Sequence, residues 1–451
     1  MATLRFDTAN RAGEFKILNA TNGGPWHKRH ANDQGRSNFS DYKAARIPYS
    51  RNHDSCLEMS YGGPYSHDIS AIFPNFDADV NDPNSYDFAC TDESILICKE
   101  AGTETFFRLG QTIEHQIVKH HVFPPKDFKK WAEICEHIIR HYNEGWANGF
   151  HYNIEYWEIW NEADCKDADG SNPCWQGTDD QFIDFYEIAA KHLKSCFPGL
   201  KIGGPAFMSP WRNDFRKNFL KAVVERKIPM DFYSYHCYAK EPREVYGTVL
   251  EAEESLKEVG LEGMYTILNE WNYVRGWMAE DWKYSLESEM GLKGSSYVAG
   301  TMSICQNSSL DMLMYYDARP CGMNGIFKSY TNDRFKGYYS FVMFRDLKRL
   351  GTWVETSRIC DDSIYSCAAT DGKNAGIMVT YFVDDETAPA KEVTLDFENV
   401  KGENGVKVEY FLLDETHDLE KVREETFTAG SFSAYLDMPV YSSYYVKVTA
   451  L

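Results

Sequence analysis

Short apolar runs alternate with amphipathic segments along the first three quarters of the chain. Residues 127–143 and 179–196 repeat apolar positions at helical spacing, and Asp127 is placed to cap the first of these helices. Between such segments, eight runs have the length and composition of buried strands. They are 15–19, 44–53, 104–110, 154–162, 200–205, 230–236, 264–272 and 311–317. Eight strands alternating with helices predict an α/β fold, a parallel (β/α)₈ or TIM barrel over residues 14–348.

The pattern changes at about residue 350. Asp, Glu, Gly and Asn separate four further strand-like runs, and no convincing helix breaks them; these runs are 374–384, 390–399, 405–413 and 440–449. This texture predicts a small antiparallel β-sandwich appended to the barrel over residues 349–451. Residues 2–8 precede the first barrel strand and are expected to add a strand to the sandwich. Because no Pro- or Ser-rich linker separates the two parts, we expect them to pack rigidly.

Charge and hydropathy narrow the classes of partner. The chain of 451 residues carries a net charge of −21, from 68 acidic and 47 basic residues. Such a surface repels nucleic acid and anionic lipid. No run of eighteen apolar residues exists, so no membrane-spanning helix is expected. The N-terminal residues lack the apolar core of a signal peptide, and we therefore expect a cytoplasmic protein.

The twelve cysteines are scattered without a CxxC pair, which gives no spacing typical of a zinc site. In a chain of this length without a secretion signal, buried free thiols are the expected state. Cys165 and Cys174 bracket a short polar loop, and they are the one pair for which a disulfide has to be checked.

Two of the strand-like runs end on a glutamate, Glu162 in the first case and Glu270 in the second. In a parallel barrel, the carboxyl ends of different strands meet at one face, so these two acids are expected to lie together. Hydrolysis of a glycosidic bond with retention needs one protonated and one ionised carboxyl group, about 5–5.5 Å apart. Glu162 fits the acid/base role and Glu270 the nucleophile role.

Several motifs then resemble one known family. EIWNEAD, ending at Asp164, and ILNEWNY, ending at Tyr273, resemble the fourth- and seventh-strand signatures of clan A retaining glycosidases. Within that clan the chain resembles glycoside hydrolase family 39, which includes β-xylosidases and α-L-iduronidases. Four further segments of the barrel share the resemblance, namely 50–55, with an Arg-x-His element, 86–110, 201–207 and 230–239.

The resemblance implies a set of roles. Glu162 would be the acid/base and Glu270 the nucleophile, Asn161 would hold the substrate, and His53 would contact a sugar at the non-reducing end. The sequence departs from the family pattern in several segments, and Ala163, for example, replaces the usual proline after the acid/base. Further candidates for binding substrate lie in such segments or beside the nucleophile. These candidates are Trp26, Arg108, Trp175, His236, Tyr238, Trp271, Tyr316 and Asp317. For Arg108, an ion pair with a nearby acid is an equally good interpretation. For Trp26, packing in the core or in its loop is the alternative.

The leading hypothesis is a retaining, exo-acting glycosidase that cleaves a terminal xylose- or arabinose-like sugar from plant-derived oligosaccharides by double displacement. It needs no cofactor and no metal, because the acid and the nucleophile both come from the chain. A glycosidase for another sugar stays open, such as galactose, glucose or a uronic acid whose carboxylate is held by Arg108 or by a Lys or Arg of a loop. A non-catalytic carbohydrate-binding barrel is the alternative from another class. A homo-oligomer also stays open, with the β-sandwich as its contact.

Overall fold

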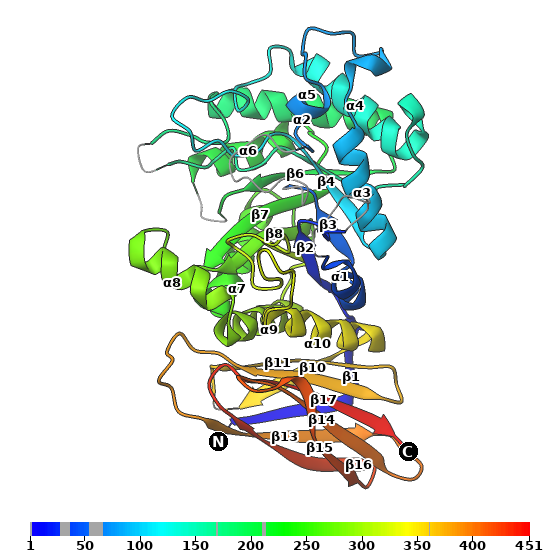
Figure 1. Cartoon of the computed structure of the whole chain (residues 1–451), viewed down its shortest axis with the longest axis vertical. Helices are drawn as coiled ribbons and strands as arrows, with labels where there is room; N and C mark the ends of the chain where they lie inside the picture. The colour runs from blue at the N-terminus through cyan, green and yellow to red at the C-terminus, as the bar shows by residue number, and fades with distance from the viewer. Residues whose placement is uncertain (1, 28–36, 54–65, 168–169, 210–212, 360) are drawn as a thin grey trace.

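The computed structural model describes residues 2–27, 37–53, 66–167, 170–209, 213–359 and 361–451, and the statements below concern these residues. The molecule has two parts stacked along its longest axis (Figure 1). One part is a closed barrel of eight strands, and the other is a sheet of nine strands. The barrel with its helices confirms the predicted α/β fold class.

All neighbouring strands of the barrel pair in parallel, and the first strand closes the ring by pairing with the last. The strands are β2 (Ile17–Asn22), β3 (Tyr49–Arg51), β4 (Glu104–Leu109), β5 (Tyr156–Ile159), β6 (Lys201–Phe207), β7 (Phe232–Ala239), β8 (Tyr265–Tyr273) and β9 (Met312–Tyr315). An apolar cluster that includes Phe106, Tyr156, Phe232 and Met312 links the starts of several strands. This cluster leaves the carboxyl ends of the strands as the place for polar groups.

The helices between these strands bury their apolar stripes against the barrel. They are α1 (Phe39–Ala45), α2 (Ile69–Ile72), α3 (Ala89–Ala101), α4 (Phe128–Glu144), α5 (Asp179–Cys196), α6 (Asp214–Glu225), α7 (Pro242–Glu258), α8 (Ala279–Glu289), α9 (Leu292–Gln306) and α10 (Gly337–Leu350). Asp127 caps α4 as predicted, because its Oδ1 accepts from the backbone N–H of Lys129 and Lys130. The predicted strand 44–53 was wrong in its extent. Helix α1 continues to Ala45, and the strand found in this range is β3, at 49–51.

The second part is one continuous sheet in the order β15-β14-β17-β12-β11-β10-β1-β13-β16. Its pairs are antiparallel except β1 with β13. The strands are β1 (Ala2–Glu14), β10 (Thr352–Ile359), β11 (Ile364–Thr370), β12 (Ala375–Tyr381), β13 (Lys391–Val400), β14 (Val406–Leu413), β15 (Asp418–Phe427), β16 (Gly430–Met438) and β17 (Ser443–Ala450). The sheet folds over into two layers around an apolar core of its own (Figure 1). The N-terminal strand joins this sheet and continues to Glu14, beyond the expected range 2–8.

The two parts share an apolar junction. In β11, Ala368 faces the core of the sheet, whereas Cys367 belongs to the core of the barrel and contacts Ser303 of α9. Lys336, at the start of α10, donates to the backbone O of Asp414 at 2.7 Å and so ties the barrel to the loop after β14. Within the described residues, no helix has both the length and the apolarity that crossing a membrane requires.

Candidate active site

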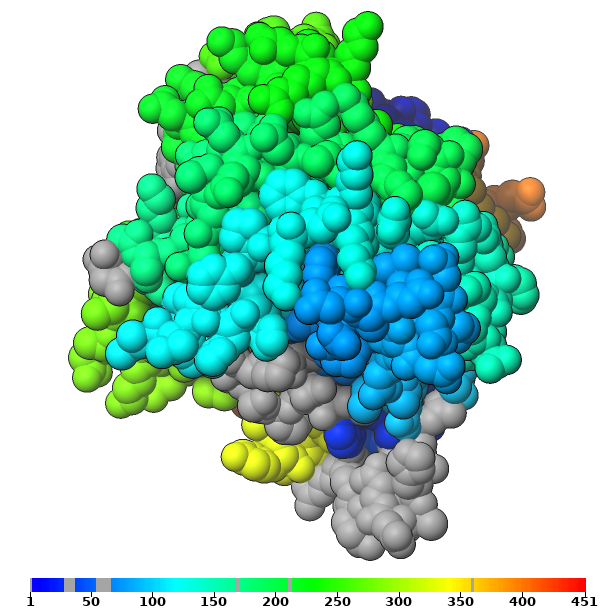
Figure 2. All heavy atoms as spheres, turned by 90° about the horizontal axis from the view of Figure 1, so that it is seen from above, coloured from blue at the N-terminus to red at the C-terminus, as the bar shows by residue number. Residues whose placement is uncertain are grey.

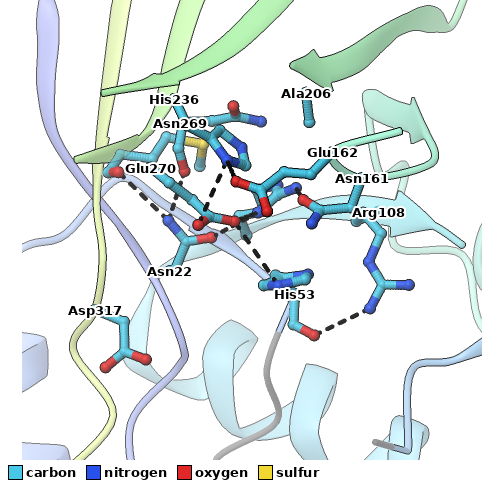
Figure 3. A network of polar contacts seen from close by, with 12 residues as sticks. Asn22, His53, Arg108, Asn161, Glu162, Ala206, His236, Asn269, Glu270 and Asp317 are labelled. Carbon is cyan, nitrogen blue, oxygen red and sulfur yellow. Dashed lines mark hydrogen bonds and ion pairs between the residues drawn. The ribbon is translucent and has the colours of Figure 1, made fainter. Parts of the chain in front are cut away.

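The carboxyl ends of three barrel strands bring together Glu162, His236 and Glu270 (Figure 3). One oxygen of each carboxylate and one ring nitrogen of His236 lie within 4.8 Å of one another. His236 Nδ1 is 2.6 Å from Glu162 Oε1 and 3.5 Å from Glu270 Oε2. The two acids predicted from separate strand ends, with His236, therefore face one another in one cluster.

Left-handed backbone aims Glu162 into this cluster. Strand β5 ends at Ile159, and Trp160 and Glu162 then have φ values of 72° and 47°. Such values in non-glycine residues cost about 1–3 kcal/mol each and persist only where the surroundings hold them. Here the N–H of Glu162 donates to the backbone O of Ala206 at 2.8 Å, and Ala206 has a φ of 54°. The fold thus fixes the position of the acid at the expense of local strain.

A fully buried guanidinium, that of Arg51 on β3, lies beneath the cluster. Its Nη1 donates to Glu270 Oε1, its Nη2 to Asn161 Oδ1 and its Nε to Glu158 Oε2, each at 2.7 Å. Nη1 also donates to Asn22 Oδ1 at 3.0 Å. Arg51 therefore orients the proposed nucleophile and Asn161 at once. Sequence analysis gave Arg51 no role, although it stands in the Arg-x-His element.

A third carboxylate, Glu158 of β5, lies in the barrel interior and is fully buried. Besides Arg51, it accepts hydrogen bonds from Ser234 Oγ at 2.6 Å and from Asn269 Nδ2 at 2.5 Å. A buried guanidinium needs compensating charge, and Glu158 supplies one of the two carboxylates that touch it. Sequence analysis did not single out Glu158, because the contacts that define its role come from other strands.

The surroundings act differently on the two acids. Burial raises the pKa of Glu162 to about 7, and the charges of Arg51 and His115 oppose this only in part. The pKa of Glu270 is also raised above its ordinary value, mainly by burial, but His236 and Arg51 oppose this rise, and Arg51 Nη1 and Tyr238 OH donate to its carboxylate. Direct donors favour the ionised form. Near pH 7, Glu162 can therefore hold a proton, whereas the contacts of Glu270 favour its carboxylate.

Two of the predicted binding residues, Tyr238 and His53, border Glu270, and Tyr316 lies beside both of them. Tyr238 donates its hydroxyl to Glu270 Oε2 at 2.8 Å, and His53 Nε2 is 3.8 Å from Glu270 Oε1. The ring of Tyr316 lies 6.3 Å from the ring of Tyr238 and 6.3 Å from the ring of His53. Burial lowers the pKa of His236 to about 4, so its ring is neutral near pH 7 and can donate from one nitrogen.

Two charged candidates are engaged within the protein. Arg108 is buried, and its Nη2 pairs with Asp68 Oδ1 at 2.9 Å and donates to the backbone O of His53 at 3.1 Å. These contacts match the alternative interpretation of Arg108, an ion pair with a nearby acid. Asp317 is also fully buried and lies 3.4 Å from Arg319 Nη2. A dashed line in Figure 3 joins the guanidinium of Arg108 to the backbone O of His53.

Two tryptophans predicted to bind substrate lie in the core instead. Trp175 is packed against Trp160 and Phe185, and its Nε1 donates to the backbone O of Thr178. Trp271 is fully buried as well. An aromatic ring after a strand end can pack in the core or line a sugar pocket, and both of these rings pack in the core. Trp26 is partly buried, and several residues that follow it lie outside the described residues, so its role stays a prediction.

The cysteine pair lies beside the acid. Cys165 and Cys174 are both free thiols in the structure, and the Sγ of each lies within 4.8 Å of a Glu162 oxygen. Cys174 Sγ is 4.0 Å from Glu162 Oε2. Their apolar, polarisable side chains therefore contribute to the dry surroundings that raise the pKa of Glu162.

A parallel eight-stranded barrel with two facing carboxylates at its strand ends has the architecture of (β/α)₈ glycosidases. Comparison with known families names the group more closely. The model of glycosyl hydrolases family 39 matches residues 51–270, a range that contains Arg51, both acids and His236. The chain is therefore similar to this family over the part of the barrel that carries the site.

Individual relatives show the same similarity. A β-xylosidase of Geobacillus stearothermophilus is 32% identical over 146 residues, which cover 30% of this chain and 26% of the relative. A β-xylosidase of Caldicellulosiruptor saccharolyticus is 27% identical over 193 residues, or 40% of this chain and 36% of the relative. The matches thus span only about a quarter to a third of these relatives. A solved glucosidase from Croceicoccus marinus shares the fold, with a TM-score of 0.81 at 20% identity, covering 100% of this chain and 99% of that one.

Proposed function

We propose that the chain is a retaining, exo-acting glycoside hydrolase that removes a terminal xylose- or arabinose-like sugar from plant-derived oligosaccharides. The meeting of Glu162 and Glu270 carries this proposal, because an oxygen of each lies within 4.8 Å of the other. Retaining enzymes place their carboxyl groups about 5–5.5 Å apart, whereas inverting enzymes need about 6.5–9.5 Å to admit water. The short separation favours direct attack by Glu270.

The reaction proceeds by double displacement. Glu270 attacks the anomeric carbon while Glu162 gives its proton to the leaving oxygen, which leaves a covalent glycosyl–enzyme and a free alcohol. Water then attacks the same carbon, Glu162 takes its proton, and the bond to Glu270 breaks with overall retention. A pKa of about 7 suits Glu162 for both halves, because it must donate a proton and then recover one.

The neighbouring groups have defined tasks in this scheme. Arg51 and Tyr238 hold the Glu270 carboxylate by one oxygen each, which fixes its direction of attack. Asn161 accepts from Arg51 through Oδ1, so its Nδ2 remains to donate to a sugar hydroxyl. His236 stands between the acids as a neutral ring and bridges them by its Nδ1. His53 and Tyr316 complete the wall beside the nucleophile.

The choice of a pentose rests on the two β-xylosidase relatives. A uronic acid held by Arg108 gains less support, because the buried Arg108 already pairs with Asp68 through Nη2. A non-catalytic binding barrel gains no support from the site, since both acids are present and in contact with His236. We further propose that residues 14–348 are the catalytic domain, and that residues 349–451 with 2–8 form an accessory domain.

Turnover of a panel of aryl glycosides tests the proposal, with xylosides, arabinosides, glucosides, galactosides and uronides compared under one condition. Glu162→Ala and Glu270→Ala should each lower turnover of the best substrate by orders of magnitude, and azide should restore activity with an activated leaving group. Glu155→Ala is the matched control, because Glu155 is exposed just before β5, at the opposite end from Glu162. Near-normal turnover in both catalytic variants would refute the mechanism, and a uronide as best substrate would refute the sugar assignment.

A further inference from the structure

An exposed tryptophan, Trp277, lies on the segment between β8 and α8. Trp277 is 55% exposed and the neighbouring Met278 is 76% exposed. Trp277 stacks on Trp282 of α8, with ring centroids 5.2 Å apart and an angle of 23° between the ring planes. Packing in the core explains neither the position nor the exposure of Trp277. Exposed apolar clusters of this kind are typical of binding surfaces.

The pair continues a row of rings that begins at the nucleophile. Tyr238, whose hydroxyl donates to Glu270 Oε2 at 2.8 Å, approaches Trp277 edge to face with ring centroids 5.1 Å apart. The row therefore runs from Glu270 through Tyr238 to Trp277 at the surface, and Trp282 supports it from behind. A molecule that extends outward from the reacting centre along this row meets an aromatic face.

The segment that carries Trp277 is held in place. Arg275 pairs through Nε with Asp281 Oδ1 at 2.9 Å, and its guanidinium lies 3.6 Å from the centre of the Tyr284 ring. The backbone N–H of Arg275 donates to Ser285 Oγ. At Gly276, an added Cβ would come within 2.9 Å of Asp281 Cβ, so the turn is closely packed. Helix α8 stands at the side of the barrel in Figure 1, and this yellow-green segment lies on the surface in Figure 2. Such a held platform binds a ligand at low entropic cost.

We propose that Tyr238, Trp277 and Trp282 form a subsite for the leaving-group part of the substrate, in which a neutral sugar ring stacks its apolar face on Trp277. This inference rests on the proposed function, because it takes Glu270 as the centre from which the substrate extends. A neutral sugar is favoured over a uronic acid because Glu280 adds negative charge in the first turn of α8, whereas Arg275 is paired with Asp281. An aromatic face with few polar groups is typical of such a surface.

The test compares two substrates that carry the same reacting sugar. A xylotetraose-type oligosaccharide reaches beyond the cleaved bond, whereas the glycosyl fluoride of that sugar has no leaving-group ring. In Trp277→Ala, the ratio of kcat/KM for the oligosaccharide to kcat/KM for the fluoride should fall about tenfold, mainly through KM, because one stacking contact is lost. Trp277→Phe should recover most of that loss. Tyr435→Ala is the control, since Tyr435 is 61% exposed on β16 of the other part.

An unchanged ratio in Trp277→Ala would overturn the subsite, and so would an equal loss with both substrates, which indicates a structural effect. Failure of the proposed function is a different result, namely that the wild-type chain hydrolyses neither substrate. In that event, calorimetric titration of the oligosaccharide into wild type and Trp277→Ala still tests the platform. Equal affinity, or absence of binding in the wild type, would then refute it.

Discussion

The carboxyl ends of the barrel strands and the nine-stranded sheet bury opposite kinds of residue. At the barrel end, Arg51, Glu158, Glu162 and Glu270 are all buried, and each depends on partners from other strands. In the sheet, valine, leucine and phenylalanine fill the core, whereas ion pairs such as Lys421–Glu424 lie outside. Buried charge costs free energy unless it is paired, whereas apolar burial stabilises. We therefore expect substitutions at the barrel end to change turnover, and substitutions in the core of the sheet to change stability.

The largest effect on turnover is expected from Glu270→Gln. This change keeps the shape of the side chain and removes the attacking carboxylate, so kcat should fall by about 10⁴-fold or more. The midpoint of thermal unfolding should fall by only a few degrees, because no cavity forms and Glu158 still pairs with the buried Arg51. Initial-rate kinetics and circular dichroism melts measure the two quantities. A fall in kcat below about tenfold would place the nucleophile elsewhere.

Phe397→Ala makes the converse change in the sheet. Phe397 is buried on β13 between Phe6 and Phe432, with ring centroids 5.4 Å and 4.8 Å away. Loss of the ring should lower the free energy of unfolding by about 3–5 kcal/mol. Turnover per folded molecule should not change at a temperature where the variant is folded. Denaturant titration with matched kinetics checks this, and loss of turnover in the folded variant would break the contrast between the two regions.

The pH dependence gives a smaller and more specific effect. Glu162 must be protonated in the first step, and burial raises its pKa to about 7, so kcat/KM should fall about tenfold per pH unit well above pH 7. In Glu162→Gln with an activated leaving group, this basic limb should vanish. A limb that persists in the variant would assign the titration to another group.

The same shift bears on stability. The folded state binds the Glu162 proton more tightly than the unfolded state, so the contribution of Glu162 to the free energy of unfolding falls as pH rises from about 4.5 to 7. Glu162→Gln should remove this slope. Urea titrations of wild type and variant at several pH values measure it, and an unchanged slope would contradict the raised pKa.

The smallest effect is expected on the outer face of the sheet. Lys421 and Glu424 are 2.9 Å apart, and both side chains are partly exposed. Exposed pairs contribute about 0–1 kcal/mol, so Lys421→Ala should change the free energy of unfolding by less than about 1 kcal/mol. Turnover should equal that of wild type. A loss above about 2 kcal/mol in denaturant titration would show that charge matters in the sheet as well.

The sequence predicted those elements whose pattern is local. Apolar strand runs and the helical stripes of α4 and α5 identified the barrel, because burial on one or both faces leaves a period in the sequence. β15 was not predicted, since its residues alternate charges with few apolar positions. The strand prediction for 44–53 was too long because the last two residues of α1, both alanines, come shortly before the strand β3. The helix ends at Arg46, whose φ is 51°, and the sequence carries no clear signal of this boundary.

The same limit applies to the site. Glu162 and Glu270 could be predicted because each ends its own apolar run. The roles of Arg51 and Glu158 could not, because they arise from contacts between strands far apart in the chain. The burial of Trp175 is likewise a result of tertiary packing.

Trapping of the covalent intermediate tests the central assignment most directly. A 2-deoxy-2-fluoro derivative of the preferred sugar, with an activated leaving group, slows both steps and lets the glycosyl–enzyme accumulate. Mass spectrometry of the digested protein should find one sugar per chain, attached to the peptide that contains Glu270 and absent from the peptide that contains Glu162. A sugar on Glu162, or complete turnover of the natural substrate with inverted product and no adduct, would contradict the account.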